Sequence, residues 1–243
     1  MVRVVSLVPS LTEAVALSAP GLLVGVTDWC THPADLDAQG VIRVRGTKNP
    51  DVGAVVRLAP DLVVANEEEN RSADLNLLRA AGLEVLVTDI RTVADAFIGL
   101  EQVLTACGTP RPRWLDQAEQ AWADPEPVEA GRRLTAVVPI WRKPWMALGR
   151  DTYAGDVLVL LGVDHVLADD TERYPRFDPD VLGALDVVVL PDEPYRFTAS
   201  DGPEAFAGTP SALVDGRSLT WYGPAMVQAP ARLREAIRAA VRS

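Results

Sequence analysis

The sequence predicts an α/β protein of two Rossmann-like lobes with mostly parallel sheets, joined by a helical connection and with a ligand cleft between the lobes. Short Val-rich runs alternate with helical patterns along the 243 residues, which is typical of parallel sheets covered by helices. One pattern occurs twice, because an Asp opens a Val-rich run at Asp61 and again at Asp186. An acid follows each Asp seven residues later, at Glu68 and Glu193, in the kind of loop where open α/β sheets bind ligands.

The first lobe begins with an apolar strand at residues 3–8. Ser10-Leu-Thr-Glu13 follows, and this capping-box pattern predicts the start of a helix. Alternation of apolar runs and helical spacing then continues to residue 88. The expected elements are strands at 3–8, 23–27, 61–65 and 84–88, and helices at 10–18, 51–58 and 72–81.

Two helices are expected to connect the lobes. Apolar residues at helical spacing fill 93–107, the Pro-containing segment 108–112 ends that helix, and a second helix covers 113–123. The second lobe has expected strands at 134–138, 163–167, 186–190 and 211–214, and helices at 154–161, 178–184, near 203–207 and at 230–241. The predicted boundaries are 1–91 for the first lobe, 92–130 for the connecting helices and 131–243 for the second lobe.

Charge and hydropathy exclude several classes of partner. A net charge of −11 repels phosphate polyanions, so we expect no nucleic-acid partner. No run of about 18 uncharged apolar residues occurs, so no membrane insertion is expected. Glu13 interrupts the apolar N-terminal stretch, which a strand and a helix explain better than a signal peptide. The compartment stays open: cytoplasmic if Met1 is native, periplasmic or lipid-anchored if a leader was removed. We expect a monomer.

Aromatic side chains gather in loops that follow predicted strands. Wide, stiff rings suit a large, flat ligand because they bury much area and lose little conformational entropy. Arginines in the second lobe can pair with carboxylates and stack on rings. The candidate ligand contacts among these loop residues are Trp29, Trp141, Trp145, Tyr174, Tyr195, Trp221, Tyr222, Arg142, Arg176, Glu68 and Glu193.

Cys30 and His32 supply a thiol and an imidazole two residues apart, and both can contact a soft or borderline metal. Two ligands do not make a metal site, and the other histidine, His165, lies at the far end of a predicted strand. We therefore predict no metal site and no required cofactor. Cys30 and His32 stay candidates to touch a metal that the ligand carries, whereas Cys107 is expected in the core.

The sequence contains few catalytic patterns, since it has no Gly-rich phosphate loop and no nucleophile elbow. Glu68 and Glu193 could do acid/base work, and a Cys30 thiolate would need a lowered pKa. We expect a non-enzymatic binding protein. The alternative is a cytoplasmic enzyme, or a sensing or delivery protein, that acts on a smaller substrate.

Eight segments carry a resemblance to a known family. They are RVVSLVPSLTE at 3–13, VGVTDWCTHP at 24–33, GTKNP at 46–50, APDLVVA at 59–65, EENR at 68–71, FDPD at 177–180, LDVVVL at 185–190 and SLTWYG at 218–223. With these segments the chain resembles the helical-backbone metal receptor superfamily, which contains cobalamin-, haem- and ferric-siderophore-binding proteins of ABC importers. The cobalamin-binding branch is the most similar.

The resemblance implies a bound metal chelate, with cobalamin or another corrinoid first and haem or a ferric siderophore next. By matching position it implies cleft contacts at Trp29, Asn66, Trp145, Tyr174 and Trp221. Asn66 departs from the cobalamin-binding branch, in which an aromatic residue follows the same strand. The resemblance also implies ABC permease subunits as partners, docked by one acid on each lobe. The matching acids here are Asp74 and Glu204.

Overall fold

The structure is a computed structural model that describes residues 2–243. It contains two compact units, each built on its own parallel sheet, so the predicted α/β class with two lobes is confirmed. The first unit comprises the chain up to Ile90 together with Ala94–Asp116 and Tyr222–Pro224. The second comprises Arg91–Val93, Gln117–Trp221 and Ala225–Ser243.

The sheet of the first unit has five parallel strands in the order β3-β2-β1-β6-β7. All five residues of β6 are buried, as expected for a Val-rich strand that is covered on both faces. The edge strand β3 was not predicted from the sequence, because two residues are too short to show a periodic pattern. The strands are β1 (Val4–Ser6), β2 (Leu23–Val26), β3 (Ile42–Arg43), β6 (Leu62–Asn66) and β7 (Val85–Thr88).

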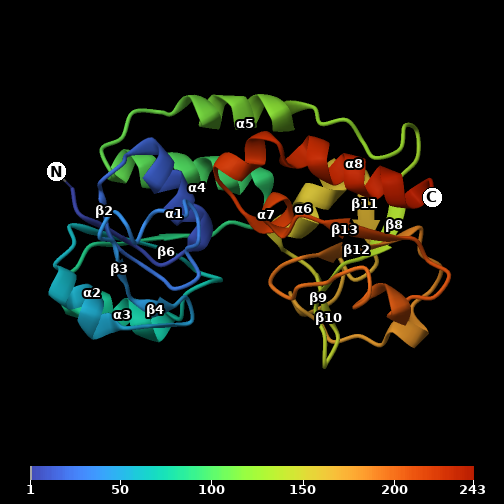
Figure 1. Cartoon of the computed structure of the whole chain (residues 1–243), viewed down its shortest axis with the longest axis horizontal. Coiled ribbons are helices and arrows are strands. Elements are labelled where there is room, and N and C mark those ends of the chain that lie inside the picture. Colours follow the sequence, from blue (N-terminus) through green and yellow to red (C-terminus); the bar gives the residue numbers. More distant parts are fainter. Residues whose placement is uncertain (1) are drawn as a thin grey trace. The chain divides into compact units, whose positions relative to one another are not determined.

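Helices cover both faces of this sheet. Figure 1 shows α1 and α4 on one side of the strands and α2 and α3 on the other. Leu75 and Leu78 of α3 pack with Val5 and Val63 of the sheet and with Leu7, which follows β1, in one buried core. The helices are α1 (Pro9–Ser18), α2 (Val52–Leu58), α3 (Ser72–Ala80) and α4 (Val93–Ala106).

The predicted capping box at the start of α1 is wrong. The helix begins one residue earlier, at Pro9, and its N-cap is Val8, which makes no side-chain capping hydrogen bond. Proline suits this first position because it lacks the N–H that a cap would otherwise have to satisfy. Ser10 therefore lies inside the first turn.

The sheet of the second unit has four parallel strands in the order β11-β8-β12-β13. A two-stranded antiparallel hairpin of β9 and β10 follows β8. The strands are β8 (Leu134–Val137), β9 (Pro139–Trp141), β10 (Met146–Ala147), β11 (Val163–His165), β12 (Val187–Pro191) and β13 (Ser211–Val214). The helices of this unit beyond residue 150 are α6 (Tyr153–Leu160), α7 (Gly216–Thr220) and α8 (Ala229–Val241).

The helix predicted at 178–184 is a single 3-10 turn, Pro179–Val181. Asp178 caps this turn by accepting a hydrogen bond from the Asp180 N–H at 3.1 Å. No residue of the turn is buried, and Val181 is 76% exposed. Because short helices in proteins persist mainly by packing an apolar face, the segment does not extend into an α-helix. The helix expected near 203–207 is likewise a 3-10 turn, Pro203–Ala205.

The helix predicted at 113–123 is confirmed as α5 (Arg113–Ala123). Within the first unit, the Trp114 indole N–H donates to Ser18 Oγ at 2.9 Å. Within the second unit, the Trp122 indole N–H donates to the Met226 carbonyl oxygen at 3.0 Å. Both tryptophans of this helix therefore have structural roles. No helix in residues 2–243 is long and apolar enough to cross a membrane.

Candidate functional site

A tight turn follows β2 at the carboxyl edge of the first sheet. The Cys30 N–H donates to the Thr27 carbonyl oxygen at 3.2 Å, so residues 27–30 form a turn closed by one hydrogen bond. Thr27 and Cys30 are fully buried, whereas Trp29 between them is 66% exposed. The turn thus offers a large aromatic ring to solvent at the edge where the sequence predicts ligand contacts.

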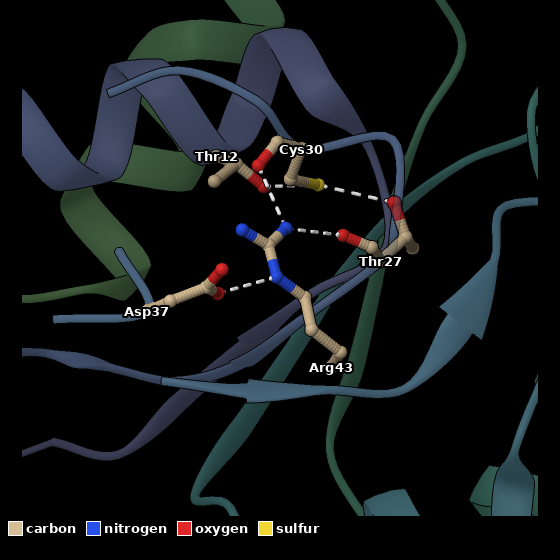
Figure 2. Close-up of polar contacts among 5 residues, drawn as sticks. All are labelled: Thr12, Thr27, Cys30, Asp37 and Arg43. Carbon is tan, nitrogen blue, oxygen red and sulfur yellow. Dashed lines mark hydrogen bonds and ion pairs between the residues drawn. The ribbon is translucent and has the colours of Figure 1, made fainter. Parts of the chain in front are cut away.

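The Cys30 thiol is held inside the first unit. Its Sγ lies 3.0 Å from Thr12 Oγ1 and 3.1 Å from Thr27 Oγ1 (Figure 2). Burial raises the pKa of the Cys30 thiol, although its hydrogen bonds with the two threonines oppose the shift. The group therefore stays a thiol near neutral pH and is poorly suited to be a nucleophile or a metal ligand.

His32 is half-buried and has a different partner, because its Nδ1 lies 3.0 Å from Thr31 Oγ1. Among residues 2–243 no group of three or more His, Cys, Asp or Glu side chains could hold a metal ion.

Asn66 ends β6 and is 2% exposed. Its side-chain amide donates to the carbonyl oxygen and to Oγ1 of Thr88, both at 3.1 Å. Its Oδ1 accepts from the N–H groups of Glu68 at 2.9 Å and Glu69 at 3.3 Å. All the polar groups of this side chain are thus used to shape the loop that carries the acids.

Lys48 lies beside the acids of this loop, and its ammonium group donates to the Glu68 carbonyl oxygen. Glu68 and Glu69 are half-buried, and Glu67 is exposed. Burial raises the pKa of the Glu69 carboxyl, while the Lys48 charge opposes this shift and the Glu68 charge adds to it. The edge of the first sheet is therefore acidic, with one lysine among the carboxylates.

The β9–β10 hairpin brings two predicted tryptophans to the edge of the second sheet. Trp145 is half-buried and stacks on Phe197, with ring centroids 5.9 Å apart. It also meets Phe206 edge-on at 5.5 Å, inside an apolar core cluster. Trp141 is 44% exposed and lies edge-on to Tyr195 at 5.6 Å. The Trp141 ring is therefore available to solvent, whereas the Trp145 ring packs on Phe197 and Phe206.

Arg142 lies between these tryptophans in the sequence and is engaged by two acids. Its guanidinium pairs with Asp201 and, at 2.6 Å, with Glu204. It also lies 5.1 Å from the centre of the Trp145 ring, and the Tyr195 hydroxyl donates to Asp201 at 2.7 Å. The positive charge of Arg142 is thus already balanced within the second unit.

Glu193 follows β12 and is half-buried. Burial raises the pKa of its carboxyl, and a hydrogen bond with the Trp221 side chain opposes this shift. The Thr220 hydroxyl donates to Glu193 Oε1 at 3.5 Å. Trp221 is 8% exposed and lies under the Arg217 guanidinium, 5.0 Å from its ring centre.

The structure thus groups the predicted residues unequally. Trp29 and Cys30 share one turn, and Asn66 and Glu68 share one loop of the first unit. In the second unit, Glu193 contacts Trp221 in one group. The other group of the second unit contains Trp141, Arg142, Trp145, Tyr195 and Glu204.

The remaining predicted residues lie outside these groups. Tyr222 is 7% exposed, Tyr174 is half-buried, and the exposed Arg176 pairs with Met146 of β10 in an isolated bridge. Asp74 is half-buried in the first turn of α3.

Sequence reasoning missed Asn70, which is 4% exposed and organises the first edge. Its side-chain amide donates to the carbonyl oxygens of Leu7 at 3.1 Å and Thr47 at 2.9 Å. A weak signal existed, because asparagine after a strand commonly bonds to nearby backbone in turns.

No family model matches the chain. The vitamin B12-binding protein of Salmonella typhi is 28% identical over 179 residues, which cover 72% of this chain. The match spans 65% of that protein's own length. An uncharacterized ABC transporter substrate-binding lipoprotein, YvrC of Bacillus subtilis, is 26% identical over 206 residues, covering 76% of this chain and 64% of YvrC.

A solved structure shares the whole fold. The periplasmic haem-binding protein RhuT from Roseiflexus sp. RS-1, in its apo form, superposes with a TM-score of 0.82 over 98% of both chains at 22% identity. The predicted resemblance is therefore confirmed as sequence similarity to vitamin B12-binding proteins and as the fold of a periplasmic haem-binding protein.

Proposed function

We propose that this chain, which has the fold of periplasmic haem-binding proteins and sequence similarity to vitamin B12-binding proteins, is a non-enzymatic substrate-binding protein for a bulky metal chelate. Cobalamin or another corrinoid is the first candidate, and haem or a ferric siderophore is the next. One observation carries the proposal. Each unit exposes one tryptophan: Trp29, three residues after β2 of the first parallel sheet, is 66% exposed, and Trp141, the last residue of the hairpin strand β9 that follows β8 of the second parallel sheet, is 44% exposed.

The exposure of the predicted residues divides them into two roles. A large ring left in water on an ordered loop is available to pack on a flat ligand. Direct contact is therefore assigned to exposed or half-buried residues, namely Trp29, Trp141, Tyr174, Arg176, Glu68, Glu193 and Tyr195. Support of the contacting loops is assigned to Asn66, Arg142, Trp145, Trp221 and Tyr222, whose polar groups or rings are engaged within their own unit or largely buried.

In the proposed setting the chain works outside the cytoplasm, as the monomeric substrate-binding protein of an ABC importer. The similarity to YvrC, an ABC transporter substrate-binding lipoprotein by name, supports this setting. Asp74 and Glu204 are the proposed contacts with permease subunits. The Glu204 carboxylate already pairs with Arg142 and accepts from the Gly202 N–H at 2.6 Å, so docking there would compete with those contacts.

An absorption titration and a thermal melt with cyanocobalamin, haemin and a ferric catecholate test this function. A ligand present at about 100 times its Kd stabilises a protein by about 2.7 kcal/mol. That change moves a melting temperature by several degrees. We expect a shift with one chromophore, and weaker binding in the Trp29→Ala and Trp141→Ala variants. Trp114→Phe, on α5, is the matched control. No shift with any of the three compounds would overturn the proposal.

The alternative, an enzyme acting on a smaller substrate, has one favourable observation. Glu193 is a half-buried carboxyl at a strand end, and burial raises its pKa. The hydrogen bonds from Trp221 and Thr220 give that carboxyl a structural role as well. The other proposed reactive group, the Cys30 thiol, is fully buried.

A further inference from the structure

We propose that Arg43 is a positioning residue for ligand binding, because its side chain holds the turn at residues 27–30 in the shape that presents Trp29 to solvent. The inference rests on the proposed function, since it concerns how the first unit makes an aromatic contact available. It adds a residue to the site that does not itself touch the ligand.

The Arg43 guanidinium closes the turn from one side. Its Nη1 donates to the carbonyl oxygens of Thr27 at 2.9 Å and Cys30 at 2.8 Å, so one nitrogen joins both ends of the turn (Figure 2). Its Nε donates to Asp37 Oδ1 at 2.7 Å, which orients the guanidinium plane. A planar guanidinium can make these contacts together, whereas a lysine ammonium lacks that rigid fork.

The Cys30 side chain anchors the turn from the other side. Figure 2 shows Cys30 Sγ between the hydroxyl groups of Thr12 and Thr27. Thr12 Oγ1 in turn donates to the Val8 carbonyl oxygen at 2.9 Å and lies 2.8 Å from Ser6 Oγ. The Cys30 side chain therefore connects the turn to α1 and to the end of β1, while Arg43, oriented by Asp37, holds the backbone carbonyl groups of the turn.

A neighbouring hairpin, formed by β4 (Arg45–Gly46) and β5 (Asn49–Pro50), contacts the exposed residues of the turn. The Asp28 N–H donates to the Arg45 carbonyl oxygen at 2.8 Å. The Trp29 indole Nε1 lies 3.4 Å from the place that a Cβ on Gly46 would take. The ring thus lies close to the hairpin backbone and has a defined position although it is largely exposed.

A loop that is ordered before binding loses less conformational entropy when the ligand arrives, so it binds more tightly than a mobile loop with the same contacts. Arg43 supplies this order for Trp29. Without the guanidinium, the Cys30 carbonyl oxygen loses its donor and the Thr27 carbonyl oxygen keeps only the turn hydrogen bond.

The first test needs no ligand. The whole chain is labelled with 5-fluorotryptophan, and the Trp29 resonance among the six tryptophans is assigned with Trp29→Phe. In Arg43→Ala we expect the ¹⁹F resonance of Trp29 to move toward that of free fluorotryptophan, with the other five unchanged. Arg79→Ala removes the same charge from the last turn of α3 and is the matched control. An unmoved Trp29 resonance in Arg43→Ala would overturn the proposal.

The second test is a double-mutant cycle with the chromophore that the wild-type protein binds. Arg43→Ala is expected to weaken binding about tenfold, because the loop must then be ordered by the ligand. If Arg43 acts through Trp29, the double variant Arg43→Ala/Trp29→Ala binds no more weakly than Trp29→Ala alone. Additive losses would mean that Arg43 acts in another way, and the inference would fail.

A third variant separates geometry from charge. Arg43→Lys keeps the positive charge but cannot span both carbonyl oxygens and Asp37, so its Trp29 resonance should also move. Full recovery of the wild-type resonance in Arg43→Lys would refute this positioning role of Arg43. The proposed function has a separate failure: if the wild-type protein binds none of the three chromophores, that function is wrong, while the ¹⁹F shifts still decide whether Arg43 positions Trp29.

Discussion

Asn70 Oδ1 accepts a hydrogen bond from the Asn66 N–H at 2.9 Å, so two buried asparagines four residues apart join the end of β6 to the loop beyond it. The other groups of the pair reach the residue after β1, the end of β7 and the turn of the β4–β5 hairpin, through Leu7, Thr88 and Thr47. The carboxyl edge of the first sheet is therefore held together by side-chain amides rather than by an aromatic residue at position 66.

Asn70→Ala should destabilise the protein strongly. The change leaves the carbonyl oxygens of Leu7 and Thr47 and the Asn66 N–H without their partner, and each buried unpaired group costs about 1–3 kcal/mol. We expect a loss of about 3 kcal/mol in a urea melt, allowing for partial access of water. Asn76→Ala, at an exposed position of α3, is the control. Equal melts for both variants would contradict the network.

Trp145 and Trp141 should differ in their effect on stability. Trp145→Ala removes a ring that packs on Phe197, Phe206 and Phe177, so we expect a loss of about 3 kcal/mol, the low end for buried aromatic truncations. Trp141→Ala removes a ring that is 44% exposed, and its loss should stay under about 1 kcal/mol. Thermal melts of both variants measure the difference. A greater loss for Trp141→Ala would reverse the roles assigned to them.

Both cysteines should resist alkylation in the native protein. Burial raises the pKa of the Cys30 thiol, and it raises the pKa of the Cys107 thiol to about 11. Iodoacetamide at pH 8 should therefore label neither residue within minutes, and should label both in denaturant, as read by mass spectrometry. The Cys107→Ala variant isolates Cys30. Rapid labelling of Cys30 in that folded variant would restore the case for a reactive thiolate.

His165 should make stability fall in mild acid. Its side chain is 6% exposed, and burial lowers its pKa below the ordinary value of 6.5, while Leu148, Asp164 and Asp169 oppose the shift. The unfolded chain then binds the proton more tightly, so the stabilisation is complete above pH 6.5 and is lost as the pH falls through the folded pKa. His165→Gln should flatten this part of the stability curve. An unchanged slope would exclude His165 as its source.

Glu193 should have the opposite dependence on pH. Burial raises the pKa of its carboxyl above the ordinary value of 4.5, so the folded state binds the proton more tightly. Its contribution is complete below pH 4.5 and is lost as the pH rises through the folded pKa. In Glu193→Gln, the unfolding free energy near neutral pH should therefore rise relative to wild type. A lower value would show that the contacts with Trp221 and Thr220 outweigh desolvation.

Local patterns in the sequence predict most of the elements. The Val-rich runs contain β1, β6, β8 and β12, and the helix predicted at 113–123 is α5, with the same bounds. Such patterns are reliable because the period of apolar residues reports which face of an element is buried. The strand β3, the β4–β5 hairpin and the helix α7 lie outside the Val-rich runs and are too short to show a helical period, so the sequence does not predict them.

The sequence by itself determined the α/β class with two lobes, the acidic character of the chain and the loops after the strands that carry the candidate ligand contacts. Only the tertiary structure decided what each side chain in those loops does. Trp29 and Trp141 are exposed, while Asn66, Arg142 and Trp145 are engaged by Thr88, Asp201 and Phe197. Periodicity reports burial along one element, but the partner of a loop side chain comes from distant segments that only folding brings together.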